Sequence, residues 1–230
     1  MDASSLQSQH NLIHVIESEK YTPSQLVSAL QTALDDGRSF HFDKVILLPR
    51  VQRLAETKSS VAAGGGEAGN DSEDATGVLI LELLQLFASG NLAGYLTQKA
   101  HFAPIMADFP QRLKKLQTIC LRQLRAALDD PDVFDYSDYI DLLEHPACAT
   151  AFESVGSGTE AKQLLELLDL FAFRTMDSKE FTTLTTNLTD AHVHKLRMLS
   201  LASYAAESKT LTYTTLRVRC LCLPRRLFPV

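Results

Sequence analysis

The sequence predicts an all-α protein, an α-solenoid of stacked helical hairpins. Apolar residues recur at spacings of three and four over most of the 230 residues, which is the period of a helix with one buried face. No long run of alternating β-branched residues, the pattern of a strand, interrupts this period. Several helical segments also occur twice in the same order, as they do in helical repeat proteins.

Four long helices carry the clearest pattern. We expect them at residues 76–90, 110–128, 160–173 and 190–206. Pro110 suits a first helical turn, Gly90 suits a helix end, and Asp190 is the expected N-cap of the last helix. Shorter helices are expected at residues 24–34, 43–55 and 137–144, and residues 211–215 form either a short strand or a linker.

Three pairs of segments make up the internal repeat. LQTALDD at residues 30–36 returns as LRAALDD at 124–130, ELLQLFA at 82–88 as ELLDLFA at 166–172, and KLQTICL at 115–121 as KLRMLSL at 195–201. The first pair is followed, at the same offset, by Phe40-His41-Phe42 and Phe134-Asp135-Tyr136. Because one helical unit cannot bury its apolar face alone, such units stack against neighbours. Solenoids of this kind generally present surfaces to other proteins.

The repeat sets the expected domain organisation. Residues 58–77 are rich in Gly, Ala, Ser and acidic residues, so they bury too little apolar surface to offset their ordering entropy, and we expect a flexible insertion there. The first repeat then comprises residues 1–57 and 78–121. A second repeat at 122–206 and a basic tail at 207–230 complete the chain.

Composition narrows the class of protein. Lysine and arginine number 22 against 28 acidic residues, a net charge of −6, so the chain lacks the basic footprint of a nucleic-acid-binding protein. The tail is the exception, because Arg217, Arg219, Arg225 and Arg226 are the last charges. No secretory signal is visible, and the most apolar run, residues 78–88, is too short to span a bilayer. We therefore expect reduced cysteines, no membrane partner, and a location in cytoplasm and nucleus.

Three stretches of the second repeat carry a family resemblance: residues 134–143, 164–172 and 188–201. The last of them runs from LT-x-A through KLR-x-LS. In these stretches the chain resembles PCI-domain proteins, a family named for the proteasome lid, the signalosome and the initiation factor. The resemblance is greatest to members in the constitutive photomorphogenesis 9 (COP9) signalosome. The first repeat resembles the same region more loosely, at residues 40–54 and 82–95.

The chain departs from the PCI pattern in two ways. The family carries one copy of this helical segment, whereas this chain holds two. The family's winged helix would begin near Tyr213 and Leu216, but only residues 217–230 follow. We therefore expect the winged helix, through which PCI subunits assemble side by side, to be absent or vestigial.

The resemblance implies a non-catalytic scaffold or interaction subunit of a PCI-type complex. The signalosome is the favoured complex, with cullin deneddylation carried out by another subunit. Partners would be the other subunits, with no small-molecule substrate, cofactor or metal. The candidate partner-interface residues are Leu196, Leu199, Tyr213 and Leu216. The runner-up is a PCI subunit of a translation initiation factor or of the proteasome lid.

A different class of function depends on His192-Val193-His194. Side chains two residues apart on a helix point about 200° from each other, so these histidines do not face one ion. The metal-isopeptidase motif also fails, because Ala202 and Ala205 stand where it needs serine and aspartate. We therefore expect no catalytic residue. The alternatives are a small α-helical hydrolase that uses His192 and Asp190, and a non-functional gene product whose altered tail prevents assembly.

Overall fold

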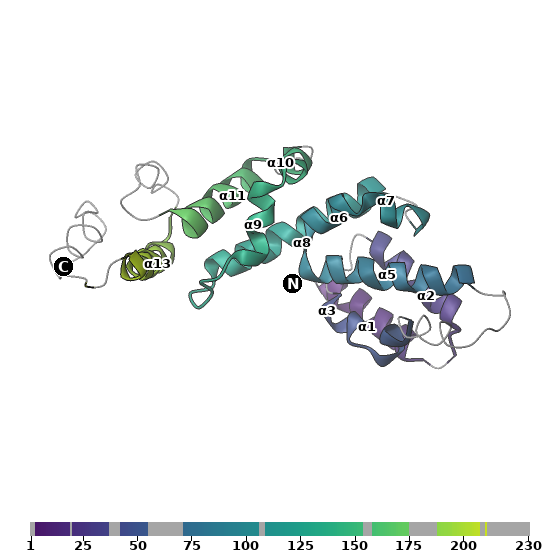
Figure 1. The fold of residues 1–230 in the computed structure, drawn as a ribbon. Helices are drawn as coiled ribbons and strands as arrows, with labels where there is room; N and C mark the ends of the chain where they lie inside the picture. Colours follow the sequence, from purple (N-terminus) through teal and green to yellow (C-terminus); the bar gives the residue numbers. More distant parts are fainter. Residues whose placement is uncertain are drawn as a thin grey trace. The chain divides into compact units, whose positions relative to one another are not determined.

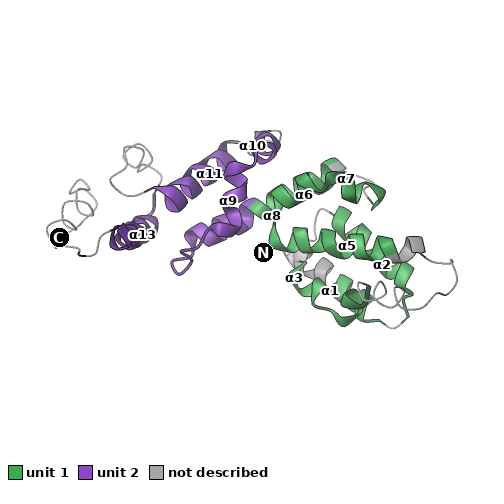
Figure 2. Cartoon of the chain, viewed as in Figure 1, with its two compact units in different colours: residues 1–120 green, residues 121–230 purple. Residues whose placement is uncertain are grey.

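The computed structural model describes residues 3–18, 20–36, 42–54, 71–105, 109–153, 158–174, 188–207 and 210. Every regular element in these ranges is a helix and none is a strand, so the all-α class is confirmed (Figure 1). The chain divides into two compact units, Met1–Cys120 and Leu121–Val230 (Figure 2). This division lies next to the expected boundary between the two repeats.

Unit 1 comprises residues 1–120. Its described helices are α1 (Ala3–Glu17), α2 (Pro23–Asp35), α3 (Asp43–Ile46), α5 (Asp71–Ser89), α6 (Leu92–Thr97), α7 (Lys99–Phe102), the 3₁₀ helix η1 (Ala103–Ile105) and the first part of α8 (Phe109–Asp129). Residues 49–54 are also helical. Helix α5 packs against both α2 and α3, so these three helices enclose the core of the unit.

Unit 2 begins within α8 and continues to the C-terminus. Its further described helices are α9 (Ser137–Glu144), α10 (Pro146–Glu153), α11 (Gly158–Phe173) and α13 (Asp190–Glu207). Helix α11 packs against α9 and α10. The long helix α8 therefore belongs to both units, closing the first and opening the second.

Helix α2 shows how the sequence encodes one element of unit 1. Thr22 is its N-cap, and a capping box with Gln25 satisfies two backbone N–H groups at this end. Pro23 occupies the first turn, where no N–H is needed. The buried residues recur at helical spacing and face the core: Leu26, Leu30, Ala33 and Leu34.

The core of unit 1 is largely aromatic. Phe42 and Phe87 meet edge to face, with ring centroids 5.9 Å apart, and Phe87 meets Tyr95 in the same way at 5.9 Å. Tyr95 then stacks on Phe102 at 6.4 Å. All four rings are buried, which brings α3, α5, α6 and α7 together around them. Burial raises the pKa of Tyr95 to about 12.

Two boundaries differ from those expected. Helix α5 begins at Asp71, so residues 71–77 are helical and the end of the expected insertion was placed too late. Acidic residues are favourable in a first helical turn, so the acidic sequence of residues 71–74 is compatible with a helix start as well as with a flexible segment. Residues 58–70 lie outside the described part of the chain. The helix expected at 43–55 is interrupted by a turn at 47–48, because Pro49 disfavours helical geometry in the residue before it.

Candidate functional site

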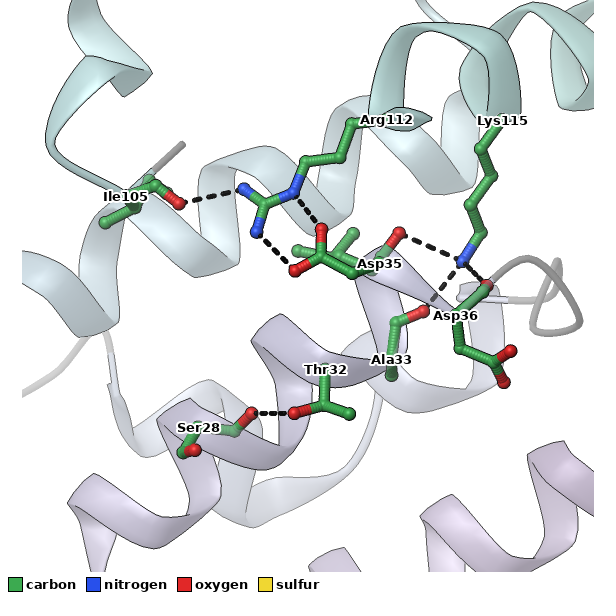
Figure 3. Close-up of polar contacts among 9 residues, drawn as sticks. Ser28, Thr32, Ala33, Asp35, Asp36, Ile105, Arg112 and Lys115 are labelled. Carbon is green, nitrogen blue, oxygen red and sulfur yellow. Dashed lines mark hydrogen bonds and ion pairs between the residues drawn. The ribbon is translucent and has the colours of Figure 1, made fainter. Parts of the chain in front are cut away.

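The Lys115 cluster lies at the C-terminal end of α2 (Figure 3). The Lys115 Nζ donates hydrogen bonds to the backbone carbonyls of Ala33 at 2.7 Å, Leu34 at 3.2 Å and Asp36 at 2.5 Å. Carbonyls at a helix C-terminus lack partners within the helix and carry partial negative charge, so an ammonium group there is favourable. Lys115, which lies on α8, therefore attaches α8 to the end of α2.

The Lys195 cluster repeats this arrangement in unit 2. The Lys195 Nζ donates to the carbonyls of Ala127 at 2.8 Å, Leu128 at 3.2 Å and Asp130 at 2.6 Å. These residues end α8 in the second copy of the LDD motif, and Lys195 begins the second copy of the KL motif on α13. The sequence repeat is therefore also a repeat of contacts.

An aromatic ring lies against each lysine. Lys115 Nζ is 4.9 Å from the centroid of Phe42, and Lys195 Nζ is 5.2 Å from that of Tyr136 and 5.6 Å from that of Phe171. Burial lowers the pKa of Lys115 to about 7, although the carboxylates of Asp36 and Asp35 oppose this shift. Burial also lowers the pKa of Lys195. Since each Nζ has three carbonyl acceptors, the arrangement suits the three N–H bonds of an ammonium group.

The two clusters differ three residues before the lysine. In unit 1 this residue is Arg112, which is 1% exposed. Its Nε donates to Asp35 Oδ1 at 2.5 Å, its Nη2 to Asp35 Oδ2 at 3.0 Å, and its Nη1 to the Ile105 carbonyl at 2.9 Å (Figure 3). This is a bidentate ion pair with a third hydrogen bond to backbone.

In unit 2 the corresponding residue is His192, which is buried. Its Nε2 lies 2.9 Å from Asp129 Oδ1, and Asp129 corresponds to Asp35 in the repeat. The Thr189 N–H donates to His192 Nδ1 at 3.5 Å, while the His192 N–H donates to Thr189 Oγ1 at 3.2 Å. Thr189 is thus the residue that caps α13, in the position expected for Asp190. The imidazole of His192 is therefore held by contacts at both of its ring nitrogens.

A pocket of about 180 Å³ lies beside His192. Three helical segments of unit 2 contribute to it, and its walls are formed by Arg125, Asp129, Glu160, Gln163, Leu164, Glu166, Leu167, Leu188 and His192. Arg125 Nη2 and Glu160 Oε1 form an ion pair at 2.7 Å. The Asp129 side chain is 59% exposed although its partner is buried. The pocket thus combines a carboxylate-rich rim with apolar walls.

A second hollow of unit 2 has exposed aromatic side chains in its lining. It is lined by residues of α9, α11, α13 and the segment before α9, including Phe134, Phe173 and Leu199. Phe134 is 44% exposed and Phe173 is 52% exposed, and Met198, next to Leu199 in sequence, is 46% exposed. Exposed aromatic and Met side chains of this kind are enriched where proteins bind one another.

The structure places the residues singled out from the sequence in different environments. Leu196 is 1% exposed and belongs to the core of unit 2, whereas Leu199 is half-buried and lines the second hollow. Tyr213 and Leu216 lie outside the described residues. His192 is buried and His194 exposed, as their spacing requires, and the imidazole of His192 meets Asp129 instead of Asp190.

No three His, Cys, Asp or Glu residues in the described ranges gather where they would hold a metal ion. Nor does any helix described by the structure combine the length and apolar character needed to cross a membrane.

Comparison with protein-family models, with curated proteins and with solved structures gives no match. The site is therefore defined by its own geometry. Sequence reasoning identified the repeated LDD and KL motifs but not their contact, because the lysines lie 65 to 82 residues from the carbonyls that they bind. The coincidence of a repeated basic residue with a repeated helix end is the signal that would have predicted it.

Proposed function

We propose that this chain is a non-catalytic scaffold subunit of a PCI-type assembly, most similar to subunit 7 of the COP9 signalosome. In this proposal the chain works in cytoplasm and nucleus, binds other subunits through its helical surfaces, and leaves cullin deneddylation to another subunit. The observation that carries the proposal is the exposure of Phe134 and Phe173 at the second hollow of unit 2, which belongs to the repeat that resembles the family.

Covering the exposed rings at this hollow would remove apolar area from water. Phe134 and Phe173 leave large apolar areas in contact with water at the rim of one hollow. A partner that covers both rings would gain the free energy of removing that area from water, about 25 cal/mol per Å². Aromatic residues at the centre of an interface often dominate its affinity. Leu199 is the sequence-predicted interface residue that such a partner would contact.

Affinity purification of the tagged full chain from cells, followed by mass spectrometry, tests this proposal. We expect the other signalosome subunits to copurify with the chain. The double variant Phe134→Ser/Phe173→Ser should lose them, because both substitutions remove apolar contact area. The matched control is Leu47→Ser in unit 1, since Leu47 is 76% exposed and lies outside the hollow. Its partners should be unchanged.

Other outcomes distinguish the competing assignments. Recovery of initiation-factor or proteasome-lid subunits instead would transfer the chain to the runner-up complex. Recovery of no PCI subunit, with the double variant behaving like the unchanged chain, would contradict the proposal.

The hydrolase alternative now concerns His192 and Asp129, which meet at the rim of the first pocket. Among the described residues of its wall there is no serine, threonine or cysteine to act as a nucleophile. A deconjugation assay on the purified chain, with and without chelator, separates the two classes of function. Turnover that disappears in His192→Ala would replace the scaffold proposal with an enzymatic one.

A further inference from the structure

We infer that the first pocket of unit 2 binds the guanidinium group of an arginine from a partner protein. The inference rests on the proposed function in taking the arginine from a partner, and it goes further by assigning the chemistry of recognition. Its starting point is that the chain contains the same cluster twice, once with its own guanidinium in place and once without it.

Unit 1 shows how this cluster holds a guanidinium. Asp35 receives Nε and Nη2 of Arg112 on its two carboxylate oxygens. This planar, two-point contact is selective for guanidinium over ammonium, because the fork of N–H groups matches the two oxygens. The Ile105 carbonyl accepts the third hydrogen bond.

In unit 2 the aspartate is kept and the arginine is replaced. Asp129 corresponds to Asp35, but His192 reaches it with one nitrogen at Oδ1. The imidazole is shorter than an arginine side chain, and the pocket of about 180 Å³ lies next to it. Since a water molecule takes about 30 Å³ in the liquid, the pocket has room for a group of several heavy atoms.

The charges of the pocket favour a cation. Three carboxylates line it, those of Asp129, Glu160 and Glu166, against one cationic side chain, Arg125. Arg125 is itself paired with Glu160 at 2.7 Å. Glu166 lies 4.0 Å from Lys162, whose side chain is exposed and does not line the pocket.

The other walls suit the remaining parts of an arginine side chain. Leu164, Leu167 and Leu188 offer apolar surface to its methylene groups and to the faces of its guanidinium plane. The His192 ring is held at both nitrogens, because Nδ1 accepts from Thr189 while Nε2 lies against Asp129. Together these features describe a receptor for one arginine side chain.

Titration of the isotope-labelled full chain with N-acetyl-arginine amide, followed by NMR, tests the inference. We expect saturable shifts of the signals of Arg125, Asp129 and His192, with a dissociation constant of about 1 mM because few atoms of the probe make contact. N-acetyl-lysine amide should bind at least tenfold more weakly. Equal binding of the two amides would overturn the assignment of a guanidinium site.

Two variants test the pocket itself. His192→Arg supplies the chain's own guanidinium, as Arg112 does in unit 1, and should abolish binding of the probe while the chain stays folded. Asp129→Asn should weaken binding at least tenfold. Asp169→Asn is the matched control, because Asp169 is a carboxylate of α11 that pairs with Arg174 and does not line the pocket. Undiminished binding by folded His192→Arg would contradict the inference, whatever the folding of Asp129→Asn.

The source of the arginine has its own test. A variant with Arg217, Arg219, Arg225 and Arg226 all replaced by Gln should bind the probe as the unchanged chain does. Tighter binding by this variant would mean that the chain's own tail competes for the pocket, and would overturn the assignment to a partner. Failure of the probe to bind, with signalosome subunits still copurifying, would end this inference and leave the proposed function standing.

Discussion

In both units a lysine at the same position of the repeat binds the carbonyls of a helix end, but the residue three positions before that lysine differs. In unit 1, Lys115 binds the end of α2 and Arg112 forms a buried ion pair with Asp35. In unit 2, Lys195 binds the end of α8, but His192 makes one hydrogen bond to a largely exposed Asp129. The lysine contact thus recurs where a helix end must be satisfied, whereas the second contact has diverged. The lysine contacts hold each unit together, whereas the position at which the units differ leaves the Asp129 carboxylate exposed for recognition.

Removing either lysine should have the largest effect. Lys115→Met and Lys195→Met each leave carbonyls at a partly buried helix end without their donor, and we expect losses of about 3 kcal/mol in the free energy of unfolding. Urea denaturation measures this loss. Hydrogen exchange should show the opening at the end of α2 in the first variant and at the end of α8 in the second. Similar losses would support equivalent roles; a loss in one variant alone would break the equivalence.

The aspartates should separate the units. Asp35→Asn leaves the buried guanidinium of Arg112 without its counter-charge, and we expect a loss of about 3 kcal/mol. Asp129→Asn removes one hydrogen bond at a side chain that is 59% exposed, and should cost about 1 kcal/mol or less. Urea denaturation of the two variants side by side provides the measurement. Equal losses would mean that the Arg-to-His difference has no energetic consequence.

The N-caps offer a smaller test of the same comparison. Thr22 caps α2 of unit 1 and Thr189 caps α13 of unit 2, each through a hydroxyl that accepts from a backbone N–H. We expect Thr22→Ala and Thr189→Ala to lose about 1 kcal/mol each. Thr189→Ala should also shift the NMR signals of the His192 ring, because the Thr189 cap fixes that residue. The Thr22→Ala variant serves as the control for that spectral change.

Two glycines of unit 1 give the smallest expected effects, with opposite signs. Gly90 has φ of 65°, so Gly90→Ala should destabilise the chain by about 1 kcal/mol. Gly77 lies inside α5, where an added Cβ would meet Leu54 at 3.6 Å, an ordinary contact. Gly77→Ala should stabilise the chain by about 0.5 kcal/mol, and it makes unit 1 resemble unit 2, which has buried Ala161 at this position of the repeat. Thermal unfolding of both variants decides the signs.

Local sequence features predicted the helices well. Thr22, Pro23 and the leucines of α2 define that helix with no tertiary information, and residues 137–144 were placed with the bounds that the structure gives. Helices α1, α6, α7 and α10 were not predicted. The short helices α6 and α7 are held by aromatic contacts of Phe87, Tyr95 and Phe102 more than by their own pattern. Short helices depend on packing in this way.

The candidate site was less predictable because it also depends on contacts between residues that are far apart in the sequence. Sequence reasoning paired His192 with its neighbour Asp190, but the fold pairs it with Asp129, 63 residues away. The capping role of Thr189 was missed because Asp190 is an equally good capping residue by type. A repeat alignment places Arg112 and His192 at one position, yet only the structure shows that the substitution leaves a pocket beside a carboxylate.

Helix α8 has a consequence for how the molecule unfolds. One continuous helix, Phe109–Asp129, supplies Lys115 to the cluster of unit 1 and carbonyls that Lys195 binds in unit 2. Fraying of α8 would therefore remove the lysine from the cluster of unit 1 and the carbonyl acceptors from the cluster of unit 2. Heat or denaturant should accordingly produce a single sigmoidal curve, as in a short one-dimensional array whose adjacent elements are strongly coupled.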